Sequence, residues 1–409
     1  MMKTLRYFLS LALLGGILGA VSAQDDRVAA LVQANNIFAG QMFQRLRQAD
    51  EQGNLFFSPY SIYQALALTY QGAHGTTAQE MAQALGWQDM SLDGLAQDFA
   101  TLNSDLLARA NRAEGVGELR IANSLWGEQS YAFAEGFLRV LDESFGAPMR
   151  LVDFLRASEA ARQAINAWVA EQTANKIQDL VPQGAVDETT RLVLANAIYF
   201  KDAWFKPFIE GATSDADFFL LGGGSVRVPM MRLSDRLGYF ADEGVQAVEL
   251  AYSNANFTML LVVPALESYA SWEADFSADD VDAILNAMRV RQVNLGLPRF
   301  RVEGEFSLRD ALQALGIVSA FDPEQADFSG MRADAARDLF ISAALHKSYI
   351  DVNEEGTEAA AATGIIMGVT SAMPDQPIDL TIDRPFVFLI RDRQSGAVLF
   401  MGRVLNPAS

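Results

Sequence analysis

The order in which two hydrophobic periodicities occur along the chain is the strongest constraint on its fold. Apolar residues three and four positions apart, the spacing of an amphipathic helix, occur early, at residues 28–48 and 162–180. Between them, Ser58 is a good helix N-cap and Pro59 suits a first turn, which predicts a helix through Leu68. Strand-like apolar segments then dominate, at residues 192–200, 245–263, 292–302, 340–353, 386–391 and 397–405. Helices followed by many strands favour one α+β domain with a substantial sheet.

The composition excludes most of the common catalytic chemistry. The 409 residues include no cysteine and two histidines, His74 and His346, which rules out disulfides, thiol catalysis, zinc–thiolate sites and iron–sulfur clusters. With 51 acidic and 31 basic side chains the net charge is −20. This balance disfavours nucleic acid, heparin-like polyanions and anionic membranes as partners, because clustered lysine and arginine bind them. The remaining carboxylates are scattered, so we expect no metal and no cofactor.

Residues 1–23 have the pattern of a secretory signal peptide. Lys3 and Arg6 precede an apolar run at residues 7–18, and small residues close the segment at Ala23. A membrane-spanning helix is the alternative, but the run is short of the roughly 20 residues that a span needs. We therefore expect cleavage after Ala23 and export to the periplasm or the exterior, with no membrane attachment afterwards.

The rest of the chain, residues 24–409, shows no internal repeat and no linker between domains. The nearest candidate is the glycine-rich stretch at residues 221–225, which is short and is typical of a hairpin turn between two strands. The sequence therefore predicts a single domain after the signal segment.

Short motifs in a fixed order are more specific than the periodicity. The early ones are residues 54–62 (NLFFSPYSI), 72–77 (GAHGTT), 165–168 (INAW), 175–180 (NKIQDL) and 194–201 (LANAIYFK) with Trp204. The later ones are residues 297–300 (LPRF), 315–317 (LGI), 326–330 (ADFSG), 352–363 (VNEEGTEAAAAT), 383–390 (DRPFVFLI) and 399–407 (LFMGRVLNP). Taken together they resemble a serpin, and in particular a secreted prokaryotic inhibitory member. One departure is Ala251, where the family pattern usually has proline.

The resemblance implies three β-sheets, about nine helices and an exposed reactive loop near the C-terminus, at about residues 354–378. Inhibitory serpins present this loop to a serine protease, which cleaves it and becomes held as an acyl ester. The loop then inserts into the main sheet and the protease is distorted before it can deacylate. The resemblance thus implies a monomeric suicide inhibitor that forms a covalent 1:1 complex and is not an enzyme.

The loop sequence is compatible with insertion as a central strand, which buries alternate side chains. The hinge implied by the resemblance runs through Glu354, Glu355, Gly356, Thr357, Glu358, Ala359, Ala360, Ala361, Ala362 and Thr363. The predicted inward positions are small or apolar and comprise Thr357, Ala359, Ala361, Thr363, Ile365 and Met367. Glu358 carries the only charge on the other face of the strand, and we expect its side chain to point outward. Gly356 supplies backbone freedom. Helix propensity alone would favour an alanine-rich helix here, whereas non-inhibitory serpins usually carry bulky, charged or proline residues.

The resemblance also places a polar cluster beneath the sheet that governs its opening. This cluster maps to Ser58, Ser61, Asn196 and His346, with Trp204 where the strand first inserts. His346 would act there by hydrogen bonding, and His74 reads as a loop or helix-end residue. A Ser–His–Asp hydrolase is therefore not expected.

The reactive bond follows from the family's nearly constant spacing after the hinge glutamate. Counting from Glu354 predicts Thr370–Ser371, with Val369–Thr370 as the second choice. Residues 359–382 contain no lysine, arginine, phenylalanine, tyrosine or tryptophan, so trypsin-like pockets have no cation to bind. The small and aliphatic run at residues 364–372 suits elastase-like or subtilisin-like proteases. A non-inhibitory serpin that acts as a carrier or chaperone, or is only a protease substrate, is the alternative function.

Overall fold

The computed structural model describes residues 5–111, 117–358 and 376–409, and within these ranges it contains nine α-helices and fifteen strands. The helices are α1 (Leu5–Ala49), α2 (Pro59–Tyr70), α3 (Gly75–Leu85), α4 (Leu92–Ala110), α5 (Glu135–Glu143), α6 (Phe154–Gln172), α7 (Tyr269–Asp275), α8 (Ala278–Ala287) and α9 (Arg309–Ala314). The first strands are β1 (Leu55–Phe57), β2 (Glu118–Glu128), β3 (Arg150–Val152), β4 (Leu192–Ala203), β5 (Ser214–Phe219), β6 (Ser225–Asp242), β7 (Val245–Ala251) and β8 (Phe257–Pro264). The others are β9 (Arg289–Pro298), β10 (Phe300–Ser307), β11 (Ala343–Val352), β12 (Gly356–Thr357), β13 (Ile378–Thr381), β14 (Phe386–Asp392) and β15 (Val398–Val404).

A six-stranded sheet forms one half of the molecule, in the order β10-β11-β12-β4-β2-β3. Its central strands β11 and β4 are parallel and pair directly only at one end, where Ala343–Lys347 lie opposite Val193–Ala197. At the other end the two-residue strand β12 lies between them and is antiparallel to both. Strands β11 and β4 are therefore paired with each other at one end of the sheet and with β12 at the other end.

A nine-stranded sheet forms the other half, in the order β1-β15-β14-β8-β7-β6-β9-β13 with β5 also on β6. The 18-residue strand β6 pairs with β7 near its end and with β5 and β9 before that. The part made of β5, β6, β9 and β13 is the third of the expected sheets, joined to the second through β6. The predicted α+β architecture with three sheets and about nine helices is thus confirmed for the described residues.

Helix α2 connects the two halves and is buried along its whole length. It begins as the sequence predicts: the Ser58 hydroxyl accepts a hydrogen bond from the Ser61 N–H at 3.1 Å, and Pro59 occupies the first turn. The Ser58 hydroxyl also donates to the Leu399 carbonyl at 2.6 Å, which ties the helix start to β15.

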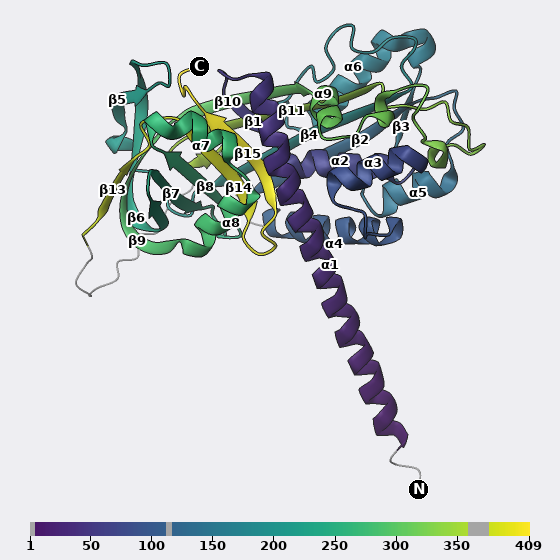
Figure 1. The fold of residues 1–409 in the computed structure, drawn as a ribbon, viewed down its shortest axis with the longest axis horizontal. Coiled ribbons are helices and arrows are strands. Elements are labelled where there is room, and N and C mark those ends of the chain that lie inside the picture. Colours follow the sequence, from purple (N-terminus) through teal and green to yellow (C-terminus); the bar gives the residue numbers. More distant parts are fainter. Residues whose placement is uncertain (1–4, 112–116, 359–375) are drawn as a thin grey trace.

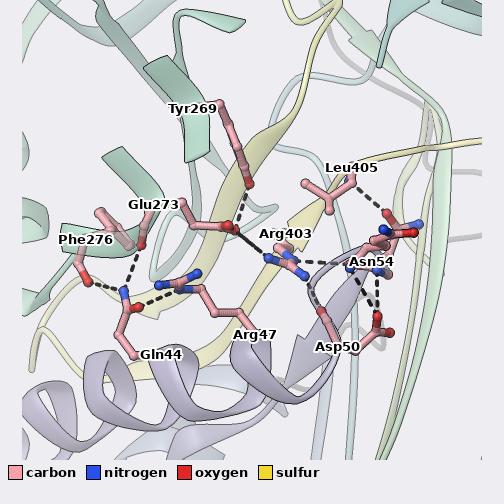
Figure 2. Close-up of polar contacts among 11 residues, drawn as sticks. Gln44, Arg47, Asp50, Asn54, Tyr269, Glu273, Phe276, Arg403 and Leu405 are labelled. Carbon is pink, nitrogen blue, oxygen red and sulfur yellow. Dashed lines mark hydrogen bonds and ion pairs between the residues drawn. The ribbon is translucent and has the colours of Figure 1, made fainter. Parts of the chain in front are cut away.

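A buried ion pair joins the end of α1 to α7 and β15 (Figure 2). The Arg403 guanidinium lies 2.9 Å from the Glu273 carboxylate, and both side chains are buried. The Tyr269 hydroxyl donates to the same carboxylate at 3.0 Å, and Arg403 donates to the Gly53 carbonyl at 3.1 Å. Removing one partner of such a pair typically costs about 3–5 kcal/mol, because the other charge is left buried and unpaired.

Several predicted boundaries are wrong, each for a local reason. The helix predicted over residues 162–180 corresponds to the later part of α6. That helix ends earlier than predicted, at Gln172, because Ala174 and Asn175 adopt positive φ angles. The strand predicted over residues 245–263 is a hairpin of β7 and β8. The strand predicted over residues 292–302 divides at Arg299, so that β9 and β10 belong to different sheets. Strand β2, in the supposedly helical part, was not predicted.

The predicted signal segment is helical from Leu5 onward. It forms the first part of α1, which runs without a break to Ala49. Figure 1 shows α1 extending away from the rest of the molecule toward the N-terminus. No helix in the described part of the chain is long and apolar enough to cross a membrane. The hairpin turn predicted at residues 221–225 connects β5 and β6.

Candidate functional site

The predicted hinge begins as part of the six-stranded sheet. Gly356 and Thr357 form β12, with Thr357 opposite Val352 of β11 and opposite Asp202 of β4. Gly356 is required there by space, because a Cβ atom at this position would lie 2.2 Å from the Asp202 carbonyl oxygen. The first two residues of a potential extra strand are therefore already seated between β11 and β4.

The Thr357 side chain faces the core. It is 1% exposed, and its hydroxyl hydrogen-bonds the Tyr252 hydroxyl at 2.7 Å. The Tyr252 ring in turn stacks on Trp204 with 4.6 Å between ring centroids. A large or charged side chain at position 357 has no room in this environment.

The Glu358 side chain lies on the opposite face from Thr357, but the expectation that it points outward into solvent is wrong. It is 4% exposed and forms an ion pair with the Lys176 ammonium at 3.3 Å. Lys176 belongs to the segment that follows α6, and this segment covers the charge. Burial, together with the nearby Glu358 charge, raises the pKa of the Tyr199 phenol.

A second ion pair fixes the turn before β12. The Glu354 carboxylate, almost fully buried, receives hydrogen bonds from the Arg299 guanidinium at 2.7 and 2.8 Å and from the Thr213 hydroxyl. Burial pushes the pKa of Glu354 upward, but these hydrogen bonds outweigh it and the net pKa is lowered. The backbone of this turn is held as well, because the backbone N–H of Trp204 donates a hydrogen bond to the Glu355 carbonyl at 2.8 Å.

Four residues predicted to govern sheet opening meet in one hydrogen-bonded cluster under the directly paired part of β11 and β4. His346 Nε2 accepts a hydrogen bond from the Ser58 N–H at 3.1 Å, so Nδ1 carries the proton and donates to the Asn196 amide oxygen. The Asn196 amide donates to the Ser61 hydroxyl at 2.7 Å. Trp204 lies apart from this cluster, beside the hinge, where its indole N–H donates to the Asn353 carbonyl at 2.9 Å.

His346 and Asn196 are also direct partners in the parallel register of β11 and β4. The hydrogen bonds of the cluster therefore stabilise the direct pairing of β11 and β4. Any strand that extends β12 must separate these two residues, so the cluster lies where the sheet has to open.

Burial lowers the pKa of His346 to about 3, so the imidazole is neutral in the folded protein. An unfolded histidine binds a proton below about pH 6.5, so between pH 3 and 6.5 the unfolded state binds the additional proton. The free energy of unfolding should then fall as the pH falls through this window, by about 1.4 kcal/mol per pH unit from this residue. We expect His346→Gln to reduce the pH slope measured by urea unfolding between pH 6 and 4. The exposed histidine variant His74→Gln is the control, and an unchanged slope in His346→Gln would contradict the assignment.

The geometry of the hinge and the cluster agrees with comparisons with known proteins. A model of the family Serpin (serine protease inhibitor) matches residues 33–407. The chain belongs to the serpin family. Bovine leukocyte elastase inhibitor is 39% identical over 396 residues, which cover 92% of this serpin and 99% of the bovine protein.

Solved structures show the same fold. Serpin48 of the insect Tenebrio molitor superposes with a TM-score of 0.80 at 31% identity, covering 92% of this serpin and 98% of that chain. Human thyroxine-binding globulin, solved in complex with thyroxine, gives a TM-score of 0.82 at 29% identity over 93% of this serpin and 99% of that chain. Membership of the family groups this serpin with protease inhibitors rather than with enzymes.

Sequence reasoning missed several residues that this serpin uses at the site. Asn123 completes the polar cluster, since it accepts a hydrogen bond from the Ser61 hydroxyl at 3.0 Å and donates to the Gln64 side chain at 2.9 Å. It lies on β2, the strand that periodicity did not identify. Arg299 and Lys176 both belong to motifs that carried the resemblance, but nothing in those motifs indicates their hinge partners.

The remaining predicted loop residues lie outside the described part of this serpin. They are Ala359, Ala360, Ala361, Ala362 and Thr363 of the hinge, Ile365 and Met367 of the predicted inward face, and Val369, Thr370 and Ser371 of the predicted reactive bonds.

Proposed function

We propose that this serpin is a single-use inhibitor of serine proteases that traps its target by inserting the cleaved loop as a full strand between β11 and β4. The observation that carries the proposal is the seating of β12, which already occupies the first two positions of that strand. Extending it would replace the parallel pairing of β11 with β4 by two antiparallel pairings, which are slightly more stable per residue. The strand would complete the sheet without changing the order of its neighbours.

The chemistry begins with the target protease. Its serine hydroxyl attacks the carbonyl of the reactive residue, the peptide bond breaks, and the amine of the next residue leaves with the C-terminal fragment. The ester that remains joins the protease to the end of the loop. Insertion of the loop then carries the protease along the sheet and distorts its active site before water can hydrolyse the ester.

We place the reactive bond at Thr370–Ser371 and assign specificity to elastase-like or subtilisin-like proteases. The loop offers small and aliphatic residues and no cation for a trypsin-like pocket. Similarity to bovine leukocyte elastase inhibitor supports a target of the elastase type.

The specificity test measures inhibition of pancreatic elastase, subtilisin and trypsin and determines the mass of the released peptide. We expect inhibition of elastase or subtilisin, none of trypsin, and a peptide that starts at Ser371. A peptide that starts at Thr370 would move the bond to Val369–Thr370 and leave the mechanism intact. Efficient trypsin inhibition would contradict the specificity. Cleavage by elastase and subtilisin without inhibition would instead identify a non-inhibitory serpin or a simple substrate.

Export is the remaining part of the proposal. The signal-like pattern of residues 1–23 supports it. N-terminal sequencing of the exported protein is expected to begin at Gln24, and an intact Met1 in the exported protein would contradict cleavage after Ala23.

A further inference from the structure

A shallow hollow that is open to solvent lies between α6, strand β2 and the edge strand β3, away from the hinge. Figure 1 shows these three elements at the end of the molecule opposite β5 and β13. The walls combine two tryptophans, an arginine, a leucine, one acid and smaller aliphatic side chains, and the members that matter here are Trp126, Arg150, Leu151, Trp168 and Glu171.

Arg150 is held in the hollow by aromatic rings rather than by an acid. Its guanidinium carbon lies 5.5 Å from the centre of the Trp126 ring and 5.0 Å from that of Trp168. The two indoles meet edge to face at 5.8 Å and form a fixed platform for the cation. Within the described ranges Arg150 forms no ion pair, although Glu171 lines the same hollow. Its five N–H donors are therefore not committed to a carboxylate among the described residues.

Trp126 provides a second unsatisfied donor. The residue is 4% exposed, and its indole N–H has no acceptor among the residues that the structure describes. Buried tryptophan N–H groups usually find a partner, because leaving such a group unpaired costs about 1–3 kcal/mol. The hollow thus combines a guanidinium without an acidic partner among the described residues and apolar walls that include Leu151, which is 48% exposed.

We propose that this hollow binds a small amphipathic carboxylate, with the carboxylate on Arg150 and an aromatic or aliphatic body against the indoles and Leu151. An arginine fork pairs with the two oxygens of a carboxylate, and charge-assisted hydrogen bonds of this kind are about twice as strong as neutral ones. A purely apolar ligand would leave the guanidinium without a counter-ion, and a bare inorganic anion would leave the apolar walls uncovered. The proposal is independent of protease inhibition.

The test uses the full chain labelled with 5-fluorotryptophan and follows its fluorine NMR signals, assigned with Trp126→Phe and Trp168→Phe. The probe is 4-phenylbutyrate, titrated to about 10 mM to cover a dissociation constant in the millimolar range. We expect saturable shifts of the Trp126 and Trp168 signals and unchanged signals for Trp87, Trp204 and Trp272. The neutral analogue 4-phenylbutanamide should bind at least about tenfold more weakly.

The matched variants are Arg150→Gln and Arg139→Gln, which each remove one exposed arginine, the latter on α5 outside the hollow. Arg150→Gln should weaken 4-phenylbutyrate binding at least about tenfold with an unchanged melting temperature, and Arg139→Gln should leave the binding unaltered. Equal affinities for the acid and its amide would overturn the proposal. So would unaltered binding in Arg150→Gln, or the absence of shifts at Trp126 and Trp168.

Discussion

Replacing Thr357 with arginine is expected to abolish the covalent complex with the target protease and to turn the protein into a substrate that is cut and released. Thr357 is already buried against Tyr252 and Trp204, and it would stay on the inward face of an inserted strand. Arginine is therefore expected to keep β12 out of its place in the intact protein, so that insertion has to bury the unpaired guanidinium at a cost of several kcal/mol. Because each 1.4 kcal/mol changes a rate ratio tenfold, the partition between trapping and release should shift by about 100-fold or more.

The measurement for Thr357→Arg is a denaturing gel after mixing with elastase, together with the protease activity that remains. Thr357→Val is the matched control, since it loses the hydrogen bond to Tyr252 but keeps a similar buried shape, and it should still form the complex. Undiminished complex formation by Thr357→Arg would show that position 357 does not face the interior of the inserted state.

Cleavage of the reactive bond is expected to raise the melting temperature of the protein well above that of the intact form. The inserted strand would gain about ten backbone hydrogen bonds at roughly 1 kcal/mol each. It would lose the short direct pairing of β11 with β4 over Ala343–Lys347 and the hydrogen bond between the His346 and Asn196 side chains. At roughly 2 cal/mol/K of unfolding entropy per residue, a gain of about 10 kcal/mol raises the melting temperature of a chain of this size by about 10 °C.

This second prediction is checked by calorimetry on intact and cleaved protein. The intact fold would then be a kinetically trapped state with one central strand missing from its main sheet. Cleaved Thr357→Arg is the control, and it should show a much smaller increase. Equal melting temperatures of the intact and cleaved wild-type forms would contradict insertion.

The sequence predicted the elements whose boundaries depend on local signals. The cap formed by Ser58 and Pro59 begins α2 as expected, and the apolar run at residues 192–200 forms most of β4. The end of α6 was missed because the apolar spacing continues past Gln172, while the positive φ angles of Ala174 and Asn175 are set by the following segment. The break at Arg299 was missed because the apolar pattern continues through it, although the chain changes sheets there.

In the candidate site, too, the features that could not be predicted are those that depend on contacts between segments distant in the sequence. Ser58, Ser61, Asn196 and His346 were predicted by the resemblance alone, since no spacing along the chain places a helix start beside two strands. The burial of Glu358 could not be predicted from strand alternation, because alternation says which face a side chain takes and not what covers that face. Lys176, which covers it, is distant in sequence and comes from a loop.

The most direct test of the central claim is to mix the mature protein with pancreatic elastase at equal concentrations and run a denaturing gel. Insertion of the loop before deacylation predicts a band at the summed mass of protease and inhibitor that survives boiling in detergent, with little cleaved free inhibitor. Complete conversion to cleaved inhibitor without such a band, by elastase and equally by subtilisin, would contradict the trapping mechanism.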